Sequence, residues 1–223
     1  IVCPEDDDAF WADYFDLGTD YSVFDSSIDP DDSYLLGAQE HGKGIRILRQ
    51  DPWEMLITFI ISQRRSIPSI RTCVEALCAR WGRPAGGGLY AFPDCDSLAA
   101  ASLDELASCG LGYRTEYVSL AARSVSSGET DLEAMERLSD EELLAALMRL
   151  RGVGPKVANC VSLFGFHRIG AFPVDVWIKR VMESLYFHED TDKKIIEKFA
   201  GDKFGEYGGY AQQYLFIYAR ENL

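Results

Sequence analysis

A lysine and an aspartate in this sequence stand at helix starts, where their side chains could act on a carbon that develops positive charge. Lys156 lies in the run LRGVGPKVANC, residues 150–160, directly after two glycines and a proline. This spacing places it in the first turn of a helix, where the positive end of the helix dipole disfavours an ammonium ion. The neutral amine is the nucleophilic form of lysine. The alternative interpretation is a surface lysine that only contacts phosphate.

Asp175 lies in FPVDVWIKR, residues 172–180, where an apolar-periodic helix begins. We expect it at the N-cap or in the first turn, where the helix dipole stabilises its charge. A carboxylate close to a neutral amine suits glycosidic cleavage, because that reaction develops positive charge at a carbon. The alternative is an aspartate that only caps the helix.

The turn before Lys156 predicts a contact with a phosphate backbone. Residues 139–166 are interpreted as a helix, a tight turn and a second helix. Gly152 and Gly154 allow backbone conformations that other residues resist, and Pro155 suits the first turn of the next helix. The exposed amides of such a turn can bind a phosphate oxygen without reading base sequence.

Helical spacing dominates the rest of the chain, and strand-like alternation is scarce. Several helices begin with clear signals, which are Asp51-Pro52, Ser66-Ile67-Pro68, Ser102 with Glu105, and Ser139 with Glu142. The spacing predicts helices over 5–15, 30–40, 52–63, 67–81, 95–101, 103–109, 113–126, 139–149, 155–166, 175–186, 191–203 and 208–220. The fold class is therefore predicted as all-α. Ile1-Val2-Cys3 is interpreted as the end of a β-strand.

Composition excludes several classes of protein. The chain has 223 residues, six cysteines and three histidines, and no two cysteines form a C-x-x-C pair. We expect reduced, mostly buried thiols and no metal centre of that kind. No apolar stretch is long enough to cross a membrane, and the first residues lack the basic start of a signal peptide. These features predict a soluble, intracellular protein.

The net charge of −14 is unevenly distributed. Residues 1–40 carry twelve acids and no lysine or arginine, whereas residues 41–81 carry seven bases against three acids. Residues 149–183 carry six bases against two acids. The two basic segments would suit a nucleic acid if they formed one face, and ordinary solvated charge is the alternative.

The motifs together resemble those of a known repair family. LRGVGPK at 150–156 and PVDV at 173–176 resemble the helix-hairpin-helix DNA glycosylase superfamily. The chain is more closely similar to the 8-oxoguanine DNA glycosylase family, in a bacterial, clostridial-type form. That likeness also rests on YFDLGTDY at 14–21, GIRILRQDPWE at 44–54, GLGYR at 110–114 and GYAQQYLFIYAREN at 209–222.

The resemblance implies two helical lobes with the helix-hairpin-helix motif and an active-site cleft between the lobes. One lobe would be discontinuous, formed by residues 1–48 and 148–223, and residues 49–147 would form the central lobe. The family's N-terminal β-rich domain would be absent. In the family, a backbone carbonyl of that domain accepts the N7 hydrogen that distinguishes 8-oxoguanine from guanine.

The resemblance also implies an activity. The chain would remove 8-oxoguanine opposite cytosine in base excision repair, with Lys156 attacking the deoxyribose C1′ to form a Schiff base. Asp175 would stabilise the developing positive charge, and β-elimination would then nick the strand. The expected partner is double-stranded DNA containing 8-oxoguanine. We expect no cofactor, no membrane association, a monomer, and action at the nucleoid in the bacterial cytoplasm.

The family's remaining site residues are carried over by position. The damaged nucleotide must leave the duplex, and Tyr113 would fill the gap as a wedge. Arg114 would read the orphaned cytosine through its planar donors, together with Gln63, Arg64 and Arg65. The base pocket would be formed by Lys156, Cys160, Gln212 and Phe216. The family's hairpin also holds a monovalent cation through carbonyls, here those around Gly152 and Gly154.

Two departures from the family pattern leave alternatives open. The loop facing the orphaned base has Gln63, Arg64, Arg65 and Ser66 where the family has several asparagines, which puts the opposite-base preference in question. Trp177 stands where some relatives have histidine. The same fold could instead excise an alkylated purine, or the chain could be a DNA-binding hairpin module without catalysis. The four-cysteine cluster of endonuclease III-like relatives is missing, which argues against oxidised pyrimidines and adenine as substrates.

Overall fold

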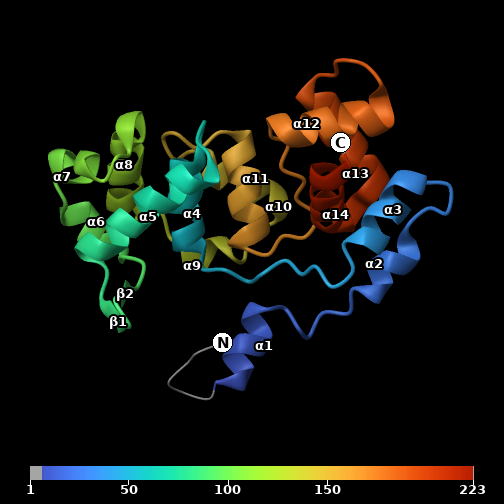
Figure 1. Cartoon of the computed structure of the whole chain (residues 1–223). Helices are drawn as coiled ribbons and strands as arrows, with labels where there is room; N and C mark the ends of the chain where they lie inside the picture. The colour runs from blue at the N-terminus through green and yellow to red at the C-terminus, as the bar shows by residue number, and fades with distance from the viewer. Residues whose placement is uncertain (1–6, 223) are drawn as a thin grey trace. The chain divides into compact units, whose positions relative to one another are not determined.

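The computed structural model describes residues 7–222. Within this range the regular elements are helices apart from one short two-stranded hairpin, so the predicted all-α fold is confirmed (Figure 1). The chain divides into two compact units, Ile1–Gln50 with Ser162–Leu223 and Asp51–Val161. We call these the first and second units. The predicted strand at residues 1–3 lies outside the described residues.

The second unit begins with two helices that the sequence signals define. Asp51 accepts a hydrogen bond from the Glu54 amide at 2.8 Å, and Pro52 follows it, so α4 (Pro52–Ser62) has both a side-chain cap and a favourable first residue. This helix is strongly apolar and buries Leu56, Ile57, Ile60 and Ile61 completely. A loop of four residues connects it to α5 (Ile67–Trp81).

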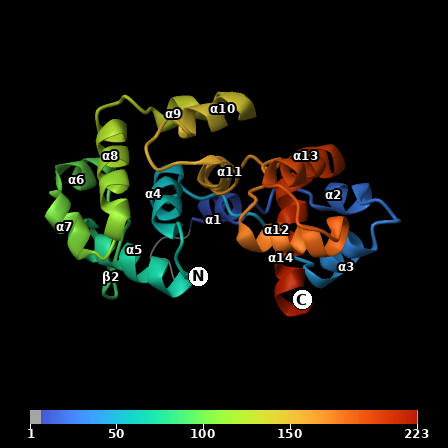
Figure 2. The same ribbon diagram turned by 90° about the horizontal axis from the view of Figure 1, so that it is seen from above.

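Two capping boxes start further helices of this unit, because Ser102 and Ser139 each exchange hydrogen bonds with the glutamate three residues later. The remaining elements are β1 (Pro84–Gly86), β2 (Leu89–Tyr90), α6 (Cys95–Ala100), α7 (Leu103–Ser108), a 3-10 turn (Gly112–Arg114), α8 (Thr115–Ser126), α9 (Leu132–Met135), α10 (Asp140–Leu147) and the start of α11 (Pro155–Phe164). In both views α6, α7 and α8 lie together (Figures 1 and 2).

The first unit packs its helices around an aromatic core. Helix α14 (Gly208–Asn222) is its centre, and α3 (Ser33–His41) lies along it in both views (Figures 1 and 2). The buried aromatic side chains include Phe24, Phe172, Phe204, Tyr210 and Tyr214. The other elements are α1 (Asp8–Tyr14), α2 (Ser22–Ser27), α12 (Val176–Met182), a π-helical turn (Glu183–Phe187), α13 (Lys193–Phe204) and a 3-10 turn (Gly205–Tyr207).

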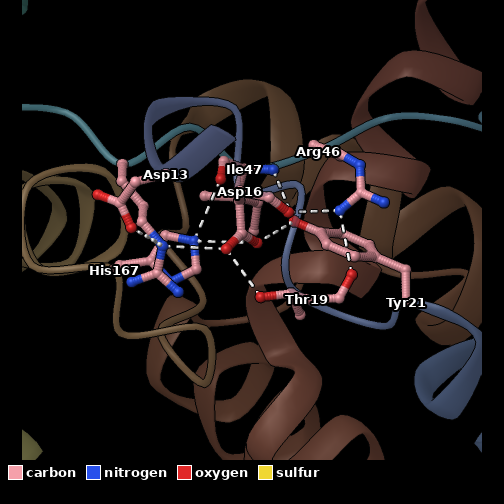
Figure 3. A network of polar contacts seen from close by, with 8 residues as sticks. Asp13, Asp16, Thr19, Tyr21, Arg46, Ile47 and His167 are labelled. Atoms are coloured by element: carbon pink, nitrogen blue, oxygen red, sulfur yellow. Dashed lines mark hydrogen bonds and ion pairs between the residues drawn. The ribbon is translucent and has the colours of Figure 1, made fainter. Parts of the chain in front are cut away.

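The buried carboxylate of Asp16 joins three segments of the first unit through hydrogen bonds and ion pairs (Figure 3). Asp16 is 1% exposed and accepts hydrogen bonds from Thr19 Oγ1 at 2.7 Å, Tyr21 OH at 3.0 Å and Arg49 Nε at 3.0 Å. His167 Nε2 lies 3.4 Å from the second carboxylate oxygen. The network therefore joins the turn after α1 to the segment that leads into α4 and to the loop after α11.

The structure differs from the predicted helix pattern in four places. It adds α2 and α9, which have few helical residues, and it places the β1–β2 hairpin in a predicted loop. It also ends α12 at Met182, so that the last part of the predicted helix 175–186 is the π-helical turn Glu183–Phe187. Among the described residues, Cys73, Cys78, Cys95, Cys109 and Cys160 form no disulfide, and Cys3 lies outside the described residues.

The predicted lobe boundaries stay a prediction, and the structure groups the chain somewhat differently. Residues 148–161 belong with the second unit, because the turn before Lys156 packs on Tyr117 and is hydrogen-bonded by Gln63. None of the helices in residues 7–222 is both long and apolar enough to cross a lipid bilayer.

Candidate active site

The turn between α10 and α11 depends on one glycine. Gly152 has φ +86°, and a Cβ atom there would lie 2.4 Å from ring carbons of Tyr117 on α8. Both the backbone conformation and the close packing therefore require glycine. Gly154 has open space around its Cβ position, and its carbonyl accepts the first hydrogen bond of α11, from Ala158 N at 2.9 Å. The predicted helix, turn and helix are present.

Lys156 occupies the first turn of α11, as the sequence predicts. Its side chain is half-buried, and Nζ lies 5.4 Å from the centre of the Phe59 ring on α4. The aromatic face gives the end of the lysine side chain a defined position within the second unit. Cys160 is buried one turn further along the same helix, which places it on the same helical face as Lys156.

Gln63 follows α4 and reaches the hairpin turn with its side chain. Its Nε2 donates to the Ile60 carbonyl at 3.0 Å and to the Gly152 carbonyl at 3.0 Å. Both amide hydrogens are therefore engaged inside the protein, and the predicted role toward an orphaned base stays a prediction. The Gly152 carbonyl, which the resemblance offers as a cation ligand, already accepts this hydrogen bond.

Arg114 and Arg65 are held by backbone carbonyls rather than by acids. Arg114 is 4% exposed, donates to the Gln63 and Leu111 carbonyls, and lies 4.2 Å from the Tyr113 ring centre. Its burial lowers the pKa of the guanidinium, and the charges of Arg65 and Arg64 lower it further. Arg65 donates to the Gly110 carbonyl, to Ser69 Oγ and to Cys73 Sγ.

Arg64 and Tyr113 are the exposed members of this cluster. Arg64 has a left-handed backbone with φ +53°, and in residues 7–222 its side chain makes no hydrogen bond or ion pair. Tyr113 is 54% exposed and packs edge-on against Tyr117 at 6.0 Å between ring centres. Both side chains are therefore accessible to a ligand.

Asp175 lies in the first unit and caps α12, as predicted. Its Oδ1 accepts a hydrogen bond from the Ile178 amide at 2.7 Å, and the carboxylate is half-buried. Gln212 on α14 is buried and donates to the Pro173 carbonyl at 3.4 Å, which joins it to the segment that carries Asp175. Phe216 lies one turn further along α14 and is partly buried against the core.

The structure thus brings the predicted residues together in two groups. The second unit holds Lys156, Cys160, Gly152, Gly154, Gln63, Arg64, Arg65, Tyr113 and Arg114, and the first unit holds Asp175, Gln212 and Phe216. Trp177 is partly buried, and within residues 7–222 its indole nitrogen has no hydrogen-bond partner.

Sequence reasoning missed Phe59 and Tyr117, which support the group in the second unit. Phe59 lies under Lys156, and Tyr117 fills the space that a side chain at Gly152 would need. Helical spacing offers one signal, because Phe59 lies one turn before Gln63 and Tyr117 one turn after Tyr113. Which residues those faces meet is a tertiary property that the sequence pattern does not contain.

Models of two protein families match the chain. The model described as HhH-GPD superfamily base excision DNA repair protein matches residues 57–204. The model of the 8-oxoguanine DNA glycosylase N-terminal domain matches residues 2–56. The described part of that second match, residues 7–56, contains helices and no strand. The predicted absence of a β-rich domain stays a prediction.

Curated relatives include enzymes from archaea and plants. A probable N-glycosylase/DNA lyase of Methanothermobacter thermautotrophicus is 31% identical over 230 residues, covering 90% of this chain and 73% of that protein. N-glycosylase/DNA lyase OGG1 of Arabidopsis thaliana is 34% identical over 191 residues, covering 79% of this chain and 52% of that protein.

Solved structures resemble the chain over nearly its whole length. The Clostridium acetobutylicum 8-oxoguanine glycosylase/lyase, in complex with double-stranded DNA containing cytosine opposite 8-oxoG, has a TM-score of 0.92 and 40% identity. It covers 99% of this chain and 77% of that one. MBOgg1, in complex with a low-affinity DNA ligand, has a TM-score of 0.93, 43% identity and the same coverage. The chain therefore belongs to the HhH-GPD superfamily of base excision DNA repair proteins.

Proposed function

We propose that this chain is an N-glycosylase/DNA lyase that excises 8-oxoguanine paired with cytosine in duplex DNA. The observation that carries the proposal is the position of Lys156, in the first turn of α11 behind the Gly152 turn. The relatives described above support the assignment, although the chain spans about half the length of the Arabidopsis enzyme and three quarters of the archaeal one.

The reaction begins with a bond between Lys156 and the sugar. The neutral amine attacks the deoxyribose C1′, and the electron pair of the glycosidic bond leaves with the base, which takes up a proton. The sugar ring then opens as the C1′–O4′ bond breaks: O4′ takes one proton from the lysine nitrogen, and the nitrogen keeps the other in a protonated Schiff base with C1′. Loss of a proton from C2′ then eliminates the 3′ phosphate, which breaks the strand, and water releases the lysine.

Asp175 serves as the electrostatic partner in this scheme. Positive charge grows at C1′ as the base departs, and a carboxylate stabilises it best when it does not have to reorient. The hydrogen bond from the Ile178 amide fixes one oxygen of Asp175 and leaves Oδ2 without a partner among the described residues. The same residue is therefore both a helix cap and a fixed negative charge.

The exposed residues of the second unit suit the DNA side of the reaction. Tyr113 presents a flat ring that can replace the extruded nucleotide in the base stack. Arg64 offers an exposed guanidinium to the O2 and N3 acceptors of the unpaired cytosine. Arg114 is 4% exposed and donates to two carbonyls inside the protein, so its predicted contact with that cytosine stays a prediction. Cys160, Gln212 and Phe216 are proposed to contact the extruded base.

We further propose that the protein acts as a monomer on chromosomal DNA, where the damaged base occurs. It would act in a bacterial cell, and it would need no bound cofactor. Hydrogen bonding, stacking and the lysine amine supply every step of the reaction, since water is the only other reactant.

The proposal is tested by a panel of duplexes that contain 8-oxoguanine, an alkylated purine or an abasic site. We expect release of 8-oxoguanine opposite cytosine and nicking of the abasic strand by the unaltered chain. Lys156→Gln should abolish both, and Lys198→Gln, an exposed lysine on α13, should have no effect. Release of the alkylated purine alone would favour that substrate class. Binding without any base release would favour a non-catalytic DNA-binding module.

A further inference from the structure

Gln63 is linked to three features of the second unit that the proposed function involves: the turn before Lys156, Arg114 and Arg64. Its side chain hydrogen-bonds the carbonyl of Gly152 in the turn that precedes Lys156. Its own backbone carbonyl accepts a hydrogen bond from the Arg114 guanidinium. The next residue in the chain is Arg64, whose side chain is exposed and makes no hydrogen bond or ion pair with the residues that the structure describes.

The direction of the side-chain bonds is fixed by chemistry. Both partners of the Gln63 amide group, the Ile60 and Gly152 carbonyls, are acceptors at 3.0 Å. Only the NH₂ end of the amide can satisfy two acceptors, so the assignment of nitrogen and oxygen is unambiguous. The Ile60 bond ties the side chain back to the last turn of α4, which leaves it little freedom to turn away from the hairpin.

Among the described residues, the hairpin turn has few other contacts that join it to the rest of the second unit. Tyr117 supports Gly152 by packing, and Arg151 Nε lies 3.7 Å from Glu116 Oε1 on α8, where both side chains are exposed. An exposed ion pair at that distance contributes little. Among residues 7–222, the Gln63 side chain therefore provides the hydrogen bond that joins the turn to the end of α4. Phe59, which lies under Lys156, is on the same end of that helix.

We propose that Gln63 is a positioning residue that couples reading of the orphaned base to the placement of Lys156. This inference rests on the proposed function. The Arg114 guanidinium already holds the segment at the Gln63 backbone carbonyl, and when Arg64 engages the unpaired base the segment is also held at the residue that follows Gln63. The side chain of Gln63 transmits that restraint to the Gly152 carbonyl, and so to the first turn of α11.

The test compares two substitutions at the end of α4. Gln63→Met keeps the length and bulk of the side chain and removes both donors. Ser62→Ala is the matched control, because it removes a side-chain bond to the Phe59 carbonyl from the same helix end without touching the hairpin. Under single-turnover conditions we expect Gln63→Met to slow 8-oxoguanine release by about tenfold, with duplex affinity changed less than about twofold. Ser62→Ala should retain the unaltered rate.

Coupling is measured by combining variants. Arg64→Ala should slow release opposite cytosine in the unaltered chain, and this effect should largely disappear in the Gln63→Met background. A residue with a purely structural role would leave the two effects additive. Additive effects, or a Gln63→Met rate equal to that of Ser62→Ala, would overturn the inference.

Hydrogen exchange in the DNA-free protein separates this inference from the proposed function. The amides of residues 150–157 should exchange faster in Gln63→Met than in Ser62→Ala, whatever the substrate is. Gln63→Glu, which replaces the donor with an acceptor facing two carbonyls, should show a larger increase. Unchanged exchange in both variants would refute the positioning role, whereas absence of 8-oxoguanine release by the unaltered chain would refute the proposed function.

Discussion

At the scale of single residues, Gly152 determines the conformation of the turn that precedes the candidate nucleophile, Lys156. Its left-handed backbone and its contact with Tyr117 leave no room for a side chain, whereas Gly154 two residues later meets neither restriction. A motif with two glycines therefore contains one position that requires glycine for steric reasons, Gly152, and one that has room for a Cβ atom, Gly154. The sequence pattern predicts the turn but does not distinguish the two.

We expect Gly152→Ala to destabilise the protein by about 2 kcal/mol or more, because it combines a strained φ with a clash against a ring. Gly154→Ala is the matched control and should change the free energy of unfolding by less than about 1 kcal/mol. Urea denaturation followed by circular dichroism measures both. Equal losses in the two variants would contradict the assignment of the strain to Gly152.

Asp175 combines two roles that substitution can separate. Asparagine is as good an N-cap as aspartate but has no charge. We therefore expect Asp175→Asn to leave the melting temperature nearly unchanged while it slows base release by about a hundredfold or more. Asp175→Ala should additionally lose about 1 kcal/mol of stability through the missing cap. A melting temperature and a single-turnover rate for each variant distinguish these effects, and an unimpaired rate in Asp175→Asn would exclude its electrostatic role.

At the scale of elements, the sequence predicts a helix wherever its start carries its own capping chemistry. Asp51-Pro52, Ser102 with Glu105 and Ser139 with Glu142 all begin helices as expected. The helix α2 was not predicted because Tyr21, at its start, makes no side-chain cap. The bond from Gln63 to Gly152 could not be predicted, because it joins segments that are far apart in sequence and come together only through tertiary packing.

The His167 loop gives the first unit a predicted dependence on pH. Burial lowers the pKa of His167 from its usual 6.5, and the nearby Arg49 charge lowers it further. As pH falls below about 6.5 the unfolded chain takes up a proton that the folded chain resists, so the folded state loses stability. Above that pH the contribution is fully present.

We therefore expect the free energy of unfolding to fall between pH 7.5 and pH 5.5, and to fall less in His167→Asn. Asparagine tolerates the left-handed backbone that His167 adopts at φ +51° and does not titrate. Urea titrations of both proteins at the two pH values measure the slope. An identical slope in the variant would show that the buried His167 is not the group responsible.

At the scale of the whole molecule, the acidic and the basic residues are concentrated in different segments of the sequence. Residues 1–40 are acidic, and the segments proposed to contact DNA are basic. The chain has a net charge of −14, yet residues 41–81 and 149–183 carry thirteen of its 22 basic residues against five acids. A protein of this charge can bind DNA only if its bases contact phosphates locally while the acidic surface faces away.

Salt dependence of duplex binding tests this distribution. We expect the logarithm of the association constant to fall linearly with the logarithm of salt concentration, with a slope corresponding to about three or more phosphate contacts. Arg64→Ala should reduce the slope if that guanidinium reaches a phosphate and leave it unchanged if it reaches only the base. Binding that is insensitive to salt would contradict a phosphate-contacting face.

The most direct test of the central claim is reduction of the reaction intermediate with borohydride, followed by identification of the cross-linked peptide. A duplex containing 8-oxoguanine opposite cytosine should yield a covalent complex, with the sugar attached through the amine of Lys156. Lys156→Gln should yield none, and Lys198→Gln should yield as much as the unaltered chain. A cross-link on another residue, or one that persists in Lys156→Gln, would contradict the account.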